Sequence, residues 1–448
     1  MATNQSSQFS ADIENYIADE TLPLARRQLV AFQFGDPLEL PKGRGTTYTA
    51  TRYNRLPLPY APLSEGVPPI GETMTIGQVS AVALQWGDKV TITDVAEMTI
   101  KHPLFKKAME LTGLQVAETL ERNTFVNLMA GTQVNFVNSR TSRFTLAAGD
   151  VLDTQTVIRT NAALTTYGAP RFMGDEMTDT KIDADAGGKR ASDNPRAMPH
   201  YAAIIHPIPA ADFRQNSTVV TAWSYSDINR LYNYELGEWS GIRFCQSNMV
   251  PSWTGYAQLT GTAGTAGALA TATYYAIVTG SDTTNQYESY LTQVTAGISV
   301  TGPTGSFSIT TPNVAGYTWS VYVGTTTTPT TLGLSASGPT AGPLAGQAVQ
   351  LPSNTAVVIT GTGMAQVPPA PVATGLTVYP TFVIGRGSYG QVVLDNVKFT
   401  YLSSADKSDP LNQLRVVGWK TMYGTLIENQ NFFARIEAVS AYSSTFDA

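Results

Sequence analysis

The chain has three histidines, the residue type that most often supplies general acid–base catalysis and metal ligands near neutral pH. His200 and His206 lie six residues apart around a short apolar run, and His102 precedes a long predicted helix. Zinc sites are typically built from paired cysteines or from an HExxH helix, and the sequence contains neither. We therefore expect core or interface histidines and no metal site.

The single cysteine, Cys245, follows Phe244 in a strand-like run. One cysteine cannot form an intrachain disulfide, and a cysteine among apolar neighbours usually behaves as a small buried hydrophobic residue. The chain also lacks the GxSxG pattern that presents a catalytic serine. We expect a buried thiol and no nucleophilic catalysis.

Two loops resemble ligand-binding motifs only loosely. Residues 385–390, Gly-Arg-Gly-Ser-Tyr-Gly, lack the Lys-Ser/Thr end of a phosphate loop, so a turn is predicted there. Asp183 and Asp185 lack the glutamate that completes a calcium loop. Lys189 and Arg190 are too short a basic run to bind nucleic acid. The sequence predicts neither an enzyme nor a cofactor site.

The composition argues against two further classes. The formal net charge is −6 and the sequence pI about 5.2, with no basic patch large enough to bind nucleic acid by counterion release. Apolar runs such as 274–278 are far shorter than the roughly 20 residues that cross a bilayer. The first residues do not resemble a signal peptide, so we expect synthesis in a reducing cytoplasm and no membrane association.

A polar, partly helical arm is predicted at the N-terminus, with a helical stretch at 10–30. Residues 46–53 alternate as a β-strand, and a second strand-like pattern runs over 74–93. The connection between them is rich in proline. A hairpin this long cannot bury both faces in its own fold, so it must lie on other parts of the chain or on a neighbouring subunit.

The strongest helix pattern covers 103–129. Its expected apolar stripe consists of Leu104, Ala108, Leu111, Leu114, Ala117 and Leu120, and Glu118 and Arg122 are expected on the solvated side. A second helix is predicted over 154–164 and a third over 227–234, with a loop at 173–199. Strands are predicted at 201–206, 241–244, 381–385, 391–394, 397–401, 414–423 and 432–439.

Between Arg243 and Arg386 the chain runs for 142 residues (385 − 243) without lysine or arginine, and only Asp282 and Glu288 are acidic there. We name residues 254–375 the neutral segment. Short strand patterns between Gly, Pro, Ser and Thr clusters predict an inserted all-β sandwich, with strands at 273–279, 290–295, 306–310, 318–323 and 356–360. Its expected core face consists of Trp319, Val321, Val323, Tyr275 and Ile277.

Short motifs outside the neutral segment follow a recognisable order: Pro41-Lys-Gly-Arg-Gly-Thr-Thr, Arg52-Tyr-Asn-Arg-Leu, Leu63-Ser-Glu-Gly-Val-Pro-Pro, Gln85-Trp-Gly-Asp-Lys-Val-Thr-Ile-Thr-Asp, Leu236-Gly-Glu-Trp-Ser-Gly-Ile-Arg-Phe, Gly385-Arg-Gly-Ser-Tyr-Gly, Asp409-Pro-Leu-Asn-Gln, Val417-Gly-Trp-Lys and Phe433-Ala-Arg-Ile-Glu-Ala. In this order they resemble the major capsid proteins of tailed bacteriophages, specifically the N-four type coat family with the Hong Kong-97 fold. The resemblance covers most of 10–253 and 376–448. The neutral segment is similar to immunoglobulin-like or fibronectin type III domains.

The resemblance implies an α+β Hong Kong-97-type capsid fold. Its parts would be an N-terminal arm (1–40), an extended loop (41–95), a peripheral domain with a spine helix (96–199), an axial domain (200–253 and 376–400), the inserted immunoglobulin-like sandwich (254–375) and return strands (401–448). The implied candidates for inter-subunit contact are Arg52, Arg55, Pro57, Pro59, Glu65 and Lys89.

The implied function is self-assembly into pentamers and hexamers of an icosahedral shell. The shell encloses double-stranded DNA without sequence-specific binding, and no cofactor is implied. A separate scaffolding protein, a portal and a decoration protein are the implied partners, with assembly in the bacterial cytoplasm. Two alternatives stay open at this point. One is a bacterial adhesion protein with an immunoglobulin-like binding module, and the other is a glycan-active enzyme with two carboxylates assembled in space.

Overall fold

The computed structural model describes residues 29–54, 56, 58, 71–99, 104–172, 199–216, 218–219, 232–282, 288–329, 332–334, 351, 353–360, 367–402 and 413–442. The predicted helical arm at 10–30, the loop at 173–199 and the helix at 227–234 lie almost wholly outside these residues. Of that last helix, 232–234 are described and form a turn in which Tyr234 has a φ of 60°.

The chain forms two compact units. The smaller consists of residues 1–27, 85–118 and 395–422, and the larger of 28–84, 119–394 and 423–448. Helices and strands are mixed in the chain, which confirms the predicted α+β class. Among the described residues, no helix is both long enough and apolar enough to cross a membrane.

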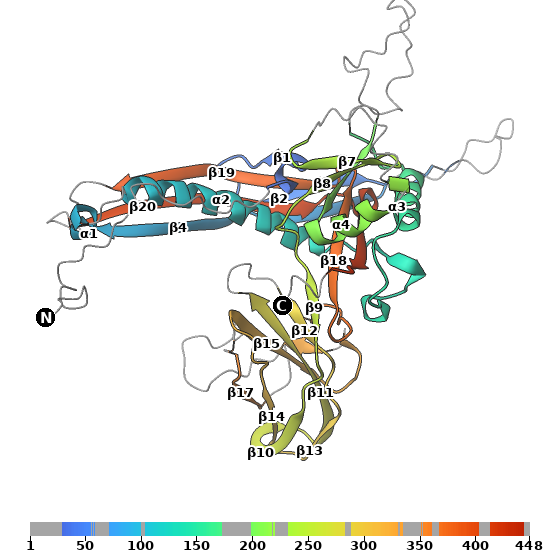
Figure 1. Ribbon diagram of the computed structural model, residues 1–448, viewed down its shortest axis with the longest axis vertical. Helices are drawn as coiled ribbons and strands as arrows, with labels where there is room; N and C mark the ends of the chain where they lie inside the picture. The colour runs from blue at the N-terminus through green and yellow to red at the C-terminus, as the bar shows by residue number, and fades with distance from the viewer. Residues whose placement is uncertain are drawn as a thin grey trace, which may run out of the picture. The chain divides into compact units, whose positions relative to one another are not determined.

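The four-stranded sheet has the order β1-β19-β20-β4 (Figure 1), and its strands are β1 (Asp36–Glu39), β19 (Tyr389–Leu402), β20 (Leu414–Ile427) and β4 (Leu84–Thr93). The strands predicted at 391–394 and 397–401 are therefore one strand. Within the smaller unit, the Trp419 Nε1–H donates to Gln115 Oε1 at 3.1 Å, and Gln115 Nε2–H donates to Asp88 at 2.6 Å. These bonds tie β20 and β4 to the helix that covers them.

That helix is α2 (Leu104–Met129), which follows the short helix α1 (Asp94–Thr99), so the predicted long helix is confirmed. The predicted stripe was right for Ala108, which is buried, and wrong for Leu111, which is 43% exposed. It also missed the buried polar residues Thr112, Glu121 and Thr124. Burial of the two threonines is possible because each hydroxyl donates to the carbonyl four residues earlier. Glu118 and Arg122, expected on the solvated side, are half-buried.

The larger unit is built on a twelve-stranded sheet with the path β16-β15-β11-β12-β9-β18-β6-β8-β7. From β9 to the edge at β7, its strands are β9 (Trp253–Tyr256), β18 (Thr377–Ile384), β6 (Tyr201–Ile205), β8 (Ile242–Gln246) and β7 (Glu235–Trp239). The strand β21 (Phe433–Val439) pairs with β18, and β5 (Val134–Phe136) pairs with β21. Four of these seven strands were predicted: β6 at 201–206, β8 at 241–244, β18 at 381–385 and β21 at 432–439.

Both faces of this sheet are covered, because β18, β6 and β21 are buried along their whole length. On β18, Val383 belongs to the core that includes α3 (Thr154–Thr166) and α4 (Pro207–Gln215), whereas Phe382 belongs to the core that includes Phe125 and Leu128 of α2. The α3 helix was predicted; α4, which begins at Pro207, was not.

In the neutral segment, two sheets share one core. One sheet contains β16 (Gly333–Leu334), β15 (Tyr317–Gly324), β11 (Ala272–Asp282) and β12 (Glu288–Thr292), with β13 (Ile298–Val300) paired to β11; the other contains β10 (Gly261–Leu269), β14 (Gly305–Thr310) and β17 (Ala356–Ile359). All five predicted strands form. The strand β10 was not predicted, since its Gly, Ala and Thr residues give a weak strand pattern.

The predicted core face of the neutral segment was wrong by one residue on β11. Antiparallel pairing sets Val321 opposite Val278 and Val323 opposite Ala276, and residues opposite one another point to the same face. The core that contains Trp319 therefore includes Tyr274, Ala276 and Val278. Ile277 lies on the other face with Tyr322 and Leu332, and Tyr275 packs against them.

Candidate functional site

A two-stranded hairpin has one exposed face in the part of the chain that the structure describes. It consists of β2 (Thr47–Tyr53) and β3 (Ile76–Val82), with Tyr53 paired to Ile76 and Tyr48 to Ala81. The second predicted strand is interrupted at Ala83, whose N–H donates to the Thr46 carbonyl at 2.8 Å, and β4 then joins the four-stranded sheet. The break lets β3 and β4 belong to different sheets.

Alternation along the hairpin separates an inner from an outer face. On the inner face, Ala81, Tyr48 and Val79 pack with Leu40, Val392 and Leu426 of the larger unit. On the outer face, Tyr53 is 63% and Ile76 is 54% exposed, although the two are directly paired. Beyond them Leu58 is 85% and Met74 is 65% exposed. A neighbouring pair of exposed apolar side chains such as Tyr53 and Ile76 is typical of a protein–protein interaction surface.

Two of the six predicted contact residues are described. Arg52 is exposed on β2 of the larger unit, and Lys89 is exposed on β4 of the smaller unit. Arg55, Pro57, Pro59 and Glu65 lie outside the described residues. The apolar members of the outer face, Tyr53 and Ile76, were missed by the sequence reasoning, although the alternation from 46 to 53 places Tyr53 on the same face as Thr47, Thr49 and Thr51.

The chain enters the larger unit through a segment held by one buried carboxylate. Glu121 Oε1 accepts the backbone N–H groups of Val30 and Ala31, each at 2.6 Å, and Oε2 accepts that of Phe32 at 3.2 Å. The Tyr389 hydroxyl donates to the Ala31 carbonyl. Burial raises the pKa of Glu121, and the three N–H donors oppose that rise only in part. Sequence reasoning missed this site because Glu121 reads as a solvated helix position.

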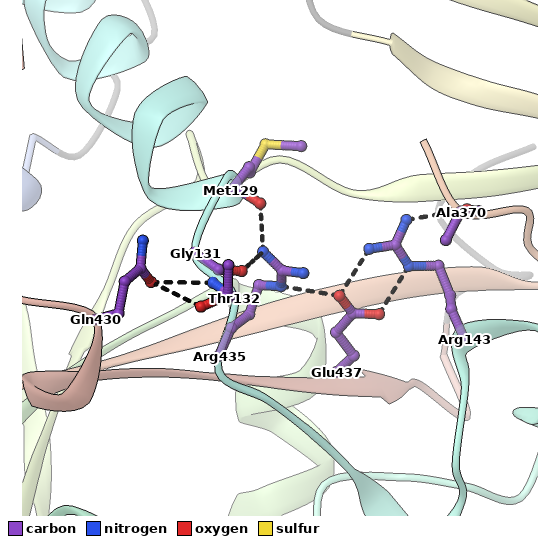
Figure 2. Close-up of polar contacts among 8 residues, drawn as sticks. All are labelled: Met129, Gly131, Thr132, Arg143, Ala370, Gln430, Arg435 and Glu437. Atoms are coloured by element: carbon purple, nitrogen blue, oxygen red, sulfur yellow. Dashed lines mark hydrogen bonds and ion pairs between the residues drawn. The ribbon is translucent and has the colours of Figure 1, made fainter. Parts of the chain in front are cut away.

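A second polar cluster lies inside the larger unit (Figure 2). The Arg143 guanidinium donates to Glu437 twice, Nε to Oε2 and Nη2 to Oε1, both at 2.7 Å. Arg435 Nε–H donates to Glu437 Oε1 at 2.8 Å, and Arg435 Nη1–H donates to the carbonyls of Gly131, at 3.2 Å, and Met129. One signal was present in the sequence: Arg435 and Glu437 stand in an otherwise apolar strand, where buried charges must be paired.

The protonation states of this cluster follow from burial and mutual charge. Burial alone would raise the pKa of Glu437, but the hydrogen bonds and positive charges of Arg143 and Arg435 outweigh it and hold that pKa below its usual value. Burial lowers the pKa of Arg435, which Glu437 opposes. The carboxylate is therefore ionised at neutral pH, as a double acceptor between two guanidinium groups requires.

The residues first considered for chemistry have structural roles where they are described. His200 is buried, and its Nε2 lies 3.0 Å from the Tyr232 hydroxyl. His206 caps α4, its Nδ1 accepting the Ile208 N–H at 3.3 Å, and burial lowers its pKa to about 4. Cys245 is buried as predicted, and burial raises the pKa of its thiol. His102, Asp183, Asp185, Lys189 and Arg190 lie outside the described residues.

The predicted turn at 385–390 is confirmed: residues 385–388 link β18 to β19, and Gly387 has a φ of 70°. Within the described part of the chain, no group of three His, Cys, Asp or Glu side chains could hold a metal ion. A groove of about 730 Å³ lies at the base of the neutral segment, and its lining is uncharged: Phe144, Gln258, Gln293, Val294, Thr327, Pro329, Pro368, Ala370 and Pro371. None of these features forms a catalytic arrangement.

No family model and no curated protein matches the sequence. Solved structures do match. The Cyanophage Pam1 capsid asymmetric unit is 10% identical, the match covering 96% of this chain and 98% of that one with a TM-score of 0.52. The capsid of Ralstonia phage GP4 is 8% identical, with 95% of each chain covered and a TM-score of 0.50. The chain has the fold of these phage capsid proteins. This likeness does not favour the alternative of an adhesion protein.

Proposed function

We propose that the chain is the major capsid protein of a tailed bacteriophage and assembles into the icosahedral shell that encloses double-stranded DNA. The observation that carries the proposal is the outer face of the β2–β3 hairpin, in a chain with a phage-capsid fold. Tyr53 and Ile76 expose apolar area to water unless another subunit covers them. Covering that area is a driving force for self-association.

At finer detail, we propose the Hong Kong-97 type of this fold and membership of the N-four coat family. Residues 41–95 then form the extended loop that lies on the adjacent subunit, and α2 is the spine of the peripheral domain (96–199). Residues 200–253 and 376–400 form the axial domain, and 401–448 return to the periphery. The neutral segment is an inserted immunoglobulin-like domain, a proposal supported by the core that its two sheets share.

The partners follow from this role. Copies of the chain form pentamers and hexamers, and a heterologous contact repeated around an axis closes such rings. Each stable interface needs about 1,600 Å² of buried surface, which a long hairpin and an N-terminal arm help to supply. A separate scaffolding protein, a portal and a decoration protein complete the particle. The chain is made and assembled in the bacterial cytoplasm and resides in the virion.

The test is assembly of the full-length chain, co-expressed with its scaffolding protein. Ile76→Asp puts a charge on the outer face of the hairpin, and Ser80→Asp puts the same charge on the same face at a polar position. We expect the unmodified chain and Ser80→Asp to form megadalton particles in light scattering and electron microscopy. Ile76→Asp should stay at the size of subunits or capsomers with an unchanged Tm.

Two results would contradict the proposal. The first is an unmodified chain that stays monomeric under all assembly conditions. The second is a normal shell formed by Ile76→Asp, which would reject the hairpin as the contact even if the shell role holds. Deleting 56–70 should likewise abolish assembly and leave a soluble subunit.

A further inference from the structure

Within the larger unit, the neutral segment begins and ends on neighbouring strands, β9 and β18. Trp253 and Thr254 of β9 pair with Val378 and Thr377 of β18 in antiparallel register. The Gly255 N–H donates to the Leu376 carbonyl at 2.8 Å, and the Gly375 N–H donates to the Gly255 carbonyl at 3.0 Å. We call this pairing the root of the neutral segment. On the other side of β9, β12 pairs with it in parallel, and Leu291 and Val372 pack in the core that includes α3 and α4. Side-chain contacts to the chain on both sides of the root add to this pairing.

Arg143 touches the chain on both sides of the root. Its guanidinium lies over the Trp253 ring, 3.6 Å from the centroid, and its Nη1–H donates to the Ala370 carbonyl at 3.1 Å. The remaining donors bind Glu437 on β21, as Figure 2 shows. One side chain thus joins the strand that leads into the neutral segment, the chain that leads out of it and the C-terminal strand.

The charge pattern of the sequence explains why this contact comes from outside the segment. The neutral segment has no lysine or arginine, so it cannot supply a cation to a ring or to a carbonyl at its own root. Arg143 and Arg435 are both nearly buried, and Arg435 also lies near the Trp253 ring at 5.6 Å. Glu437 balances one of the two charges. The carbonyls at the C-terminal end of α2 stabilise the charge of Arg435, and the Trp253 ring face stabilises the charges of both arginines.

We infer that Arg143 is the anchoring residue of the neutral segment, and that its planar fork fixes the segment at the root. The inference does not depend on the proposed shell function. Lysine in its place keeps the positive charge, but a single ammonium group cannot make all of these contacts at once. It cannot donate twice to Glu437 and once to Ala370 while also stacking on Trp253. Arg143→Lys therefore separates anchoring by geometry from simple charge balance.

The test is hydrogen–deuterium exchange of the full-length chain. In Arg143→Lys, the backbone N–H groups of Gly255 and Gly375 should exchange at least tenfold faster than in the unmodified chain. Exchange along β11 and β15 should not change, because the core of the neutral segment does not include Arg143. Trp253→Phe keeps an aromatic ring, but a phenyl ring attracts a cation more weakly than an indole ring. It should therefore raise the exchange rates of the same two N–H groups by a smaller factor.

The matched control is Arg243→Lys. Arg243 is also buried and paired, its Nη1 lying 3.0 Å from Glu235 Oε1, but that pair joins β8 to β7. It should accelerate exchange in β7 and β8 and leave the root unchanged. The inference is overturned if Arg143→Lys leaves Gly255 and Gly375 unchanged. It is also overturned if exchange rises by the same factor in β11, β15 and the root, or if Arg243→Lys opens the root equally.

Discussion

Glu121 accepts the backbone N–H of Val30 at 2.6 Å, although the two residues are 91 positions apart. With Ala31 and Phe32, three consecutive backbone donors find their acceptor in one side chain of α2. Among the described residues, no backbone carbonyl of a neighbouring strand accepts these three N–H groups. The path of the chain at the start of the larger unit therefore depends on one carboxylate rather than on sheet pairing.

Replacing Glu121 with leucine should lower the free energy of unfolding by about 2–4 kcal/mol, because three buried N–H groups lose their acceptor. Glutamine keeps one acceptor oxygen for Val30 and Ala31 and should cost about 1 kcal/mol or less. Urea unfolding at pH 7 measures both. Glu110→Leu, at an exposed position of the same helix, should change stability by less than about 0.5 kcal/mol. Equal effects at positions 110 and 121 would reject the acceptor role.

Two glycines around α2 should respond in opposite directions to alanine. A Cβ at Gly131 would overlap the Phe433 ring, so Gly131→Ala should lower stability by about 1–3 kcal/mol. A Cβ at Gly113 meets no atom within 4 Å, so Gly113→Ala should raise stability by up to about 1 kcal/mol through its better helix propensity. Thermal unfolding of the two variants provides the comparison. A stabilising Gly131→Ala would mean that Phe433 moves aside at little cost.

Glu437→Gln should be among the most damaging single substitutions in the larger unit. It leaves the buried guanidinium groups of Arg143 and Arg435 without a counter-charge, at a cost of about 3–5 kcal/mol at pH 7. The pKa of Glu437 lies below its unfolded value of 4.5, so its contribution is present above pH 4.5 and is lost as pH falls through the folded pKa. The stability gap between the unmodified chain and the variant should therefore narrow in acid. If the stability difference between the two proteins does not depend on pH, the loss in Glu437→Gln comes from packing and not from the carboxylate charge.

Acid should also act through His206. The pKa of His206 is about 4 in the folded chain and 6.5 in the unfolded chain, so folding opposes protonation of the imidazole. The contribution of neutral His206 to the free energy of unfolding is fully present above pH 6.5 and is lost as pH falls from 6.5 towards 4. The loss is about 2 kcal/mol between pH 7 and 5. Asparagine keeps a capping side chain but does not titrate. Between pH 7 and pH 5, His206→Asn should therefore lose less stability than the unmodified chain. Urea unfolding of both proteins at the two pH values measures the difference.

Local patterns predicted the elements well where one physical cause dominates. The strands β18 and β21 read as apolar runs because both of their faces are covered, and α2 stands out by its length. The faces were harder to predict. Ile277 and Val278 are both apolar, and only the pairing with Tyr322 and Val321 decides which of them faces Trp319. The register of the pairing between β11 and β15 cannot be predicted from a single sequence.

The polar sites could not be predicted, because their partners are brought together only by the fold. Arg143 and Glu437 are 294 positions apart, and Glu121 binds backbone groups that have no side-chain signature. The exposed pair on the hairpin is an intermediate case. Alternation places Tyr53 and Ile76 on a common face, but which face stays uncovered depends on how Tyr48 and Ala81 meet the larger unit.

The root of the neutral segment has a practical consequence. Its two ends lie on hydrogen-bonded neighbours, about 5 Å apart, as in an ordinary hairpin. A tight turn can therefore close the same two strands, and any foreign domain whose own termini are adjacent can be grafted in its place. Either change also removes β12, so the replacement must cover the edge of β9 that β12 occupies. The position is an attachment point for displaying a chosen protein on this chain.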